Sequence, residues 1–181
     1  TQMIENFRFI ARILAVPHNQ VRIECPYVGG GFGGKIMMTI EPFLALLAKA
    51  AGRPVQMSLS REESILSSTK RHPYTMHYKA GADAEGRLIA WKADIVGDAG
   101  AYTELSAVLC KYSMVQASGP YRCENTKVDM RMVLTHNPVG TAMRGVGSPQ
   151  ITFAIEGVMD TLSEKLGMDP FAFRKKNYLS K

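Results

Sequence analysis

The residues best suited to binding chemistry are the glycine-rich run GGGFGGK at residues 29–35. Five of its seven residues are glycine, and a glycine inside a helix or strand costs roughly 0.5–1 kcal/mol relative to alanine. A chain keeps such a run where its backbone adopts positive φ or approaches another group closely. Bare N–H groups also suit anionic or electron-rich oxygens. The run predicts a loop that binds through its main chain; the alternative is a tight strand–helix turn that binds nothing.

Two nucleotide-binding templates match these glycines in part. The dinucleotide fingerprint fits from Gly29 to Gly34, and most of a P-loop fits as well. A P-loop needs a Ser or Thr next, to hold Mg²⁺, and the chain has Ile36 there. The dinucleotide motif follows a strand directly and places an acid about 20 residues later, whereas here Pro26-Tyr27 intervene and Glu62 comes too late. A nucleotide-binding α/β module using this loop therefore stays only as an alternative.

A second glycine-containing loop, TAMRGVGSPQ, occupies residues 141–150. It follows a run of alternating apolar residues at 127–135, which predicts a half-buried strand. It precedes a clean helical stripe of Ile151, Ala154, Ile155, Val158, Met159, Leu162 and Leu166. The stripe is typical of a core-facing helix. Arg144, between the loop's small residues, is a candidate binding residue, and a surface arginine is the alternative.

The remaining composition limits the classes of function. The formal net charge is +6, but the basic residues are scattered, so no nucleic-acid partner is expected. Three cysteines without C-x-x-C spacing and four ungrouped histidines indicate no metal cluster held by side chains. No apolar run approaches the roughly 18 residues of a membrane span. A cytoplasmic protein without a membrane partner is the default expectation.

The pattern of helices and strands predicts an α+β fold, in which helices pack on a layered mixed sheet. Helices are expected at residues 3–14, at 41–51 with Gly52 as the stop, at 105–115 and at 149–166. Two short helices are also expected, one begun by a capping box of Ser60 and Glu63 and one after Asp169. Strands are expected at 21–25, 55–59, 74–82, 88–97 and 127–135. The 181 residues suit part of one domain. They could divide into two small packed subdomains, residues 1–70 with 120–181 and a hairpin region at 71–119.

The two loops together resemble those of the molybdenum-binding subunit of the xanthine dehydrogenase/aldehyde oxidoreductase family. The first is similar to that family's GGGFGGK loop, and AMRGVGSPQ is similar to its A-(F/M)-R-G-(F/Y)-G-x-P-Q loop. Other similar pieces follow the family's order: GRPV at 52–55, RHP at 71–73, EKLGMDP at 164–170 and RKKN at 174–177. The resemblance spans nearly the whole chain and implies a partial molybdenum-cofactor-binding domain.

The resemblance implies a molybdopterin cofactor, in which a pyranopterin dithiolene holds the molybdenum and no protein side chain ligates the metal. The cytosine dinucleotide form of the cofactor is one option. By residue-by-residue comparison, Gly31, Phe32 and Gly33 approach the apical side of the metal, and Arg144 and Gly145 line the other side of the cofactor. The implied reaction is oxidative hydroxylation of a small-molecule substrate, with water as the oxygen source.

Several parts of such an enzyme are expected outside this chain. The family's general-base glutamate lies in a motif that is absent here, so the chain by itself is expected to be inactive. Iron–sulfur and FAD groups are expected only on partner domains or subunits, beside the remainder of the molybdenum domain. Two departures bear on the substrate: purine hydroxylases carry a glutamate where this chain has Ile36, and a stacking aromatic where it has Val146. An aldehyde or an aromatic N-heterocycle is therefore expected rather than xanthine.

Overall fold

The computed structural model describes residues 3–179 and shows two compact units, Thr1–Lys70 and Arg71–Lys181. The second unit contains the hairpin region together with residues 120–181. This division differs from the sequence-based grouping, which joined residues 120–181 to residues 1–70. The reason is that the apolar stripe of the long helix beginning at Ser148 packs on the hairpin strands.

The first unit is built from helices and irregular chain. Its elements are α1 (Met3–Leu14), the 3₁₀ helix η1 (His18–Gln20), α2 (Glu41–Ala51) and α3 (Arg61–Ser67). The predicted helix ends are confirmed in two places. Gly52, with a φ of 62°, ends α2, because glycine adopts the left-handed conformation without a Cβ penalty. Ser60 and Glu63 form the predicted capping box at the start of α3.

Two predicted strands of this unit, residues 21–25 and 55–59, are wrong: neither segment pairs as a strand within the described chain. Their side chains still alternate between half-buried and exposed positions. A period of two is necessary for a strand, but a strand also needs a neighbouring backbone to complete its ladder. The described residues of this unit supply no such neighbour.

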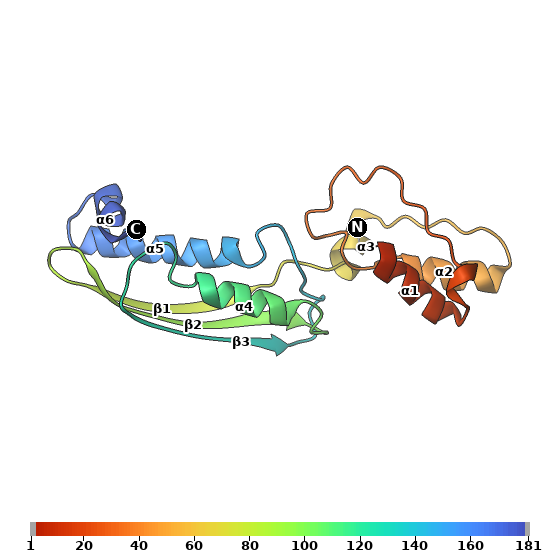
Figure 1. Ribbon diagram of the computed structural model, residues 1–181, viewed down its shortest axis with the longest axis horizontal. Coiled ribbons are helices and arrows are strands. Elements are labelled where there is room, and N and C mark those ends of the chain that lie inside the picture. Colours follow the sequence, from red (N-terminus) through yellow and green to blue (C-terminus); the bar gives the residue numbers. More distant parts are fainter. Residues whose placement is uncertain (1–2, 180–181) are drawn as a thin grey trace. The chain divides into compact units, whose positions relative to one another are not determined.

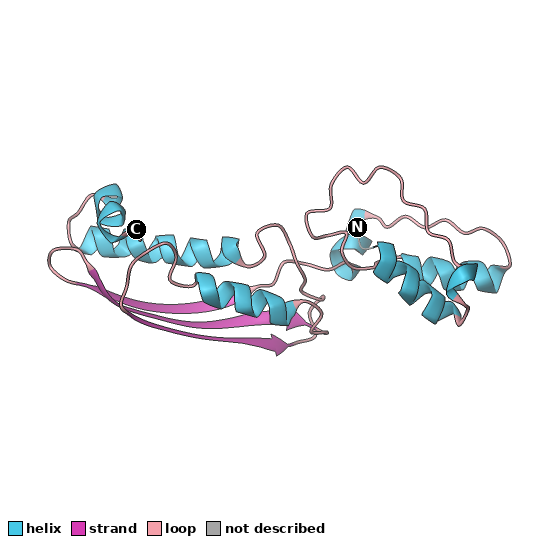
Figure 2. Ribbon diagram, in the orientation of Figure 1, coloured by secondary structure: helices cyan, strands magenta, loops and turns pink. Residues whose placement is uncertain are grey.

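The second unit is a three-stranded mixed sheet covered by helices (Figures 1 and 2). Its elements are β1 (Tyr74–Ala82), β2 (Leu88–Gly100), α4 (Ser106–Gln116), β3 (Asn125–Leu134), α5 (Ser148–Lys165) and α6 (Pro170–Asn177). β1 and β2 form the predicted antiparallel hairpin, and β3 lies parallel to β2. A parallel neighbour needs a crossover connection, which α4 provides. The predicted α+β class with a mixed sheet is confirmed.

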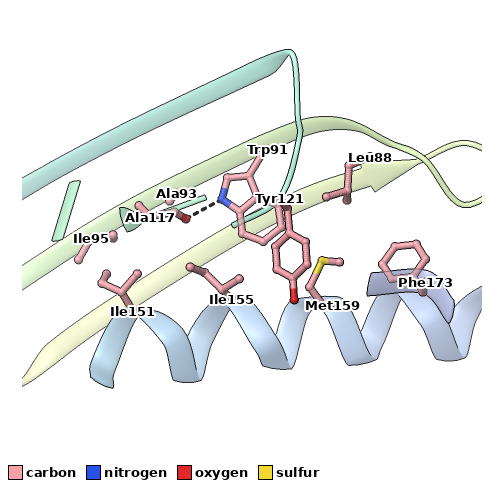
Figure 3. Packing of buried hydrophobic residues seen from close by; sticks show 10 residues of the cluster. All are labelled: Leu88, Trp91, Ala93, Ile95, Ala117, Tyr121, Ile151, Ile155, Met159 and Phe173. Carbon is pink, nitrogen blue, oxygen red and sulfur yellow. Dashed lines mark hydrogen bonds between the residues drawn. The ribbon is translucent and has the colours of Figure 1, made fainter. Parts of the chain in front are cut away.

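The core lies between the sheet and α5 (Figure 3). Every second residue of β2 is buried on this face, including Trp91, Ala93 and Ile95, and they meet Ile151 and Ile155 of α5. The Nε1 of Trp91 donates a hydrogen bond to the carbonyl of Ala117 at 2.9 Å, so the indole is buried without losing its polar contact. Beyond this core, Arg174 of α6 forms ion pairs with Glu156 and Asp160 of α5 and joins the two helices.

The helices of residues 3–179 include no segment with the length and apolar character needed to cross a membrane.

Candidate functional site

The first glycine loop is an irregular turn held by its own main chain. Gly31 leads into a turn at residues 32–35, in which Phe32 has a φ of 49° and Gly33 a φ of 100°. The N–H of Ile36 donates to the carbonyl of Gly33 at 3.1 Å and closes the turn. A non-glycine residue in the left-handed region is strained, so this turn keeps Phe32 in an unfavourable conformation.

The surroundings of this loop agree with a binding role. Lys35 does not point away from the protein; its Nζ donates to the carbonyl of Val28 at 2.5 Å and bridges the base of the loop. Phe32 is 61% exposed. A cavity of about 410 Å³ borders the loop, with Val28, Gly34 and Lys35 among its lining residues. The hydrogen bond from Lys35 to Val28 thus joins the two ends of the loop, and Phe32 between them is exposed.

The second glycine loop, in the other unit, repeats this arrangement. Gly145, Val146 and Gly147 have φ angles of 94°, 45° and 91°. The N–H of Val146 donates to the carbonyl of Met143 at 2.8 Å, and the N–H of Ser148 donates to that of Gly145 at 2.9 Å. Again a non-glycine residue takes the left-handed conformation between glycines. Gly145 is exposed, so its main chain is accessible.

The loop is fastened to the residues just before β1 by two side-chain hydrogen bonds. The Nη2 of Arg71 donates to the carbonyl oxygen of Arg144 at 2.8 Å. In the opposite direction, the Nε2 of Gln150 donates to the carbonyl oxygen of His72 at 2.9 Å. Each segment therefore contributes one side chain and one backbone carbonyl to the other. We refer to these two hydrogen bonds as the reciprocal clamp.

A buried polar cluster connects the start of the second loop and the residues before β1 with the start of α4. His72 is 1% exposed, and its Nε2 lies 2.8 Å from the Oγ of Ser106 at the start of α4. The Oγ1 of Thr141, which is 2% exposed, donates to the Oε2 of Glu104 at 2.6 Å. Burial lowers the pKa of His72, and the nearby carboxylates of Asp98 and Glu104 oppose that shift. The cluster holds the loop's first residues against α4.

The last glycine of the loop meets α4 closely. A Cβ added to Gly147 would lie 2.3 Å from the Oγ of Ser113. That hydroxyl is itself held 2.9 Å from the phenolic oxygen of Tyr74, and burial raises the pKa of this phenol. Glycine is required at position 147 both by its φ and by this approach.

The structure places the predicted site residues in two groups, one in each unit. Gly31, Phe32, Gly33 and Ile36 belong to the first turn, and the other predicted residues, Arg144, Gly145 and Val146, belong to the second. Ile36 and Val146 are both half-buried.

Sequence reasoning assigned no role to Arg71 and Gln150, which contact the second loop or its neighbour. Both lie in pieces already noted as similar to the family, RHP and the loop ending in SPQ. The available signal was that a charged and an amide side chain stand beside conformationally demanding glycines. Only the structure shows that each of them reaches a backbone carbonyl.

The two loops fit a ligand that is bound through main chain. Within residues 3–179 no group of three or more His, Cys, Asp or Glu side chains is arranged to hold a metal ion. What the loops offer instead is glycine backbone at positive φ, such as Gly33 and Gly145, where a Cβ is strained. Exposed or half-buried glycine backbone, rather than a cluster of metal-ligating side chains, is what each of the two loops presents.

Comparisons with known proteins show the family of this chain. The molybdopterin cofactor-binding domain family matches residues 1–178. The chain is 44% identical over 168 residues to a probable xanthine dehydrogenase subunit of Bacillus subtilis (strain 168), covering 93% of this chain and 23% of that protein. It is also 44% identical over 168 residues to the nicotinate dehydrogenase large molybdopterin subunit of Eubacterium barkeri, covering 93% of this chain and 40% of that protein. The solved structure of the aldehyde oxidoreductase from Desulfovibrio gigas superposes with a TM-score of 0.83 at 34% identity, over 96% of this chain and 19% of that one.

The chain belongs to the molybdopterin cofactor-binding domain family. The family membership predicted from the two loops is confirmed, and the comparisons give no support to the nucleotide-binding alternative. The chain spans between 19% and 40% of the length of these three relatives.

Proposed function

We propose that this chain provides two backbone loops of the cofactor site in a molybdenum hydroxylase, and that the enzyme hydroxylates an aldehyde or an aromatic N-heterocycle. The observation that supports this proposal is the shared geometry of the loops. Four non-glycine residues of the described chain have positive φ, and two of them, Phe32 and Val146, sit beside glycines in these loops. Backbone strain of this kind is typical of functional sites.

The bound cofactor supplies the redox chemistry that moves oxygen derived from water onto an electrophilic carbon. The chain's own contribution is orientation. Gly31, Phe32 and Gly33 of the first loop would hold the cofactor through their main chain, as would Arg144 and Gly145 of the second loop. Backbone donors that are already fixed need no reorganisation during turnover, and both loops are closed by internal hydrogen bonds.

The substrate class follows from the two half-buried aliphatic residues, Ile36 and Val146. Neither can donate or accept a hydrogen bond through its side chain, so a polar heterocycle such as xanthine would lose an anchor there. Loss of a designed polar contact changes selectivity by several orders of magnitude. The names of the relatives include nicotinate and aldehyde substrates, which agree with the proposal, and also xanthine.

Several finer expectations remain predictions. They are the cytosine dinucleotide form of the cofactor, the iron–sulfur and FAD partners, the general-base glutamate outside residues 1–181, and the cytoplasmic location. The relatives named as subunits support a multi-subunit arrangement.

The test uses the full-length protein that contains this chain, purified with its partner subunits. Metal and pterin analysis is expected to find about one molybdenum per complex, as a resident cofactor requires. Absence of molybdenum from an intact, folded complex contradicts the proposal. The same preparation, assayed with an artificial electron acceptor, is expected to oxidise an aldehyde or nicotinate faster than xanthine. Rapid turnover of xanthine contradicts the interpretation of Ile36.

A further inference from the structure

The reciprocal clamp carries an inference about two residues that have no assigned role. Arg71 and Gln150 are far apart in sequence, yet each holds the main chain of the other's segment at 2.8 and 2.9 Å. The contact joins the second glycine loop to the residues that precede β1. It lies entirely within the second unit.

We infer that Arg71 and Gln150 are positioning residues that orient the backbone N–H of Gly145 toward the cofactor. This inference rests on the proposed function of the second loop. A peptide group is planar, and in a trans peptide its C=O and N–H point in opposite directions. No cis peptide occurs among the described residues. Holding the carbonyl oxygen of Arg144 therefore fixes the direction of the next N–H, which belongs to Gly145.

Glycine alone does not fix that direction. Gly145 is exposed, and glycine has the widest range of backbone conformations. The turn's own hydrogen bonds close it from within, but they leave the Arg144–Gly145 peptide plane to external contacts. The guanidinium of Arg71 supplies such a contact through its hydrogen bond to the carbonyl of Arg144. Gln150 holds the end of the loop through its hydrogen bond to the carbonyl of His72. The clamp thus selects one orientation of this peptide plane before any ligand binds.

Each clamp side chain makes one hydrogen bond and leaves another of its buried polar atoms without a partner among the described residues. The Nη1 of Arg71 and the Oε1 of Gln150 are buried and find no hydrogen-bond partner among residues 3–179. Burial of polar atoms without partners is unfavourable, so each side chain offsets part of the stability that its one hydrogen bond contributes. What the clamp supplies beyond that small net stability is a fixed direction for two backbone carbonyls.

The experiment uses the full-length enzyme complex, with hydrogen exchange of the peptide spanning residues 141–150 as the first measurement. In cofactor-free enzyme, Arg71→Ala and Gln150→Glu are expected to speed exchange at Val146 and Ser148 on the order of tenfold. Gln150→Glu keeps the size of the side chain but replaces the donor. Arg71→Lys keeps one donor and is expected to give an intermediate rate. Arg87→Ala, at an exposed arginine of the hairpin, is the matched control and is expected to leave exchange unchanged.

The second measurement is the molybdenum and pterin content of the same variants after gel filtration. Loss of a residue that supports a metal site typically lowers affinity about 10- to 100-fold, so both clamp variants are expected to lose cofactor, whereas Arg71→Lys retains part of it. Unchanged exchange in both clamp variants overturns the inference. Faster exchange with full cofactor retention overturns the link to the cofactor. Wild-type complex without molybdenum contradicts the proposed function instead, and the exchange rates then still decide whether the clamp orders the loop.

Discussion

The Oγ of Ser113 lies so close to Gly147 that a Cβ added to the glycine would be 2.3 Å from it. The two residues join the middle of α4 to the residue before α5. At a φ of 91°, position 147 also excludes ordinary side chains on conformational grounds. A side chain at position 147 therefore meets both a steric clash with Ser113 and backbone strain from the positive φ. Replacing Ser113 by alanine removes the clash and leaves the strain.

We expect Gly147→Ala to lower the free energy of unfolding by about 2–4 kcal/mol, from left-handed strain and overpacking together. In a Ser113→Ala background the serine oxygen is gone, and the remaining neighbours, the Tyr74 hydroxyl at 3.4 Å and the Cβ of residue 113 at 3.6 Å, are at ordinary contact distance. The penalty should then fall to about 1–2 kcal/mol, the cost of the conformation alone. Denaturant unfolding of the four proteins measures this cycle, and equal penalties in both backgrounds contradict the packing argument.

Gly157 provides the matched control for this series. It lies within α5, and a Cβ added there meets no atom within 4 Å. Because glycine costs helix stability relative to alanine, Gly157→Ala should stabilise the protein by about 0.5–1 kcal/mol.

The first loop allows a comparison between adjacent glycines. Gly33 has a φ of 100°, whereas Gly34 has no such conformation and a Cβ there meets only the carbonyl of Gly31 at 3.7 Å. We expect Gly33→Ala to lower the molybdenum content of the full-length complex, because the turn that presents Phe32 has to rearrange. Gly34→Ala should bind molybdenum like the wild type. Equal loss in both variants would show that space at the cofactor, rather than backbone conformation, requires these glycines.

Ile36 offers a test of substrate selectivity. A glutamate at this position would introduce a polar anchor of the kind that purine hydroxylases of the family carry after the loop lysine. Ile36→Glu is therefore expected to raise kcat/KM for xanthine relative to an aldehyde by about tenfold or more. Steady-state assays of both substrates measure the ratio, and molybdenum content serves as the control for site integrity. An unchanged ratio in a fully loaded enzyme contradicts the placement of Ile36 at the substrate.

His72 gives the second unit a predicted dependence on pH. Burial lowers the pKa of its imidazole below the ordinary 6.5, while Asp98 and Glu104 partly oppose the shift. Below about pH 6.5, His72 therefore binds a proton more readily in the unfolded chain than in the folded chain. Stability contributed by neutral His72 is present above that pH and is lost as the pH falls through the lowered pKa.

The measurement is the unfolding midpoint of wild-type and His72→Gln proteins between about pH 5 and pH 8, the range in which histidine titrates. Glutamine cannot titrate, so the variant should lose less stability than the wild type on acidification. A variant that matches the slope of the wild type in this range would assign the pH dependence to other groups.

Much of the second unit follows from local sequence. The alternation at residues 127–135 predicted a half-buried strand, and the stripe that includes Ile151 and Ile155 predicted a core helix; both are found. Capping residues such as Ser60 and Asp169 also set helix starts as expected. These predictions succeed because side-chain period and end-capping depend on residues only a few positions apart.

The same reasoning failed where a structure depends on a distant partner. Residues 21–25 and 55–59 alternate as strands do but form no ladder among the described residues, because pairing requires a second backbone that no local pattern specifies. The sequence by itself determined the two glycine loops and the family to which they belong. Only the tertiary structure decided that Arg71 and Gln150 hold the second loop, because the hydrogen bonds to Arg144 and His72 join segments more than 70 residues apart.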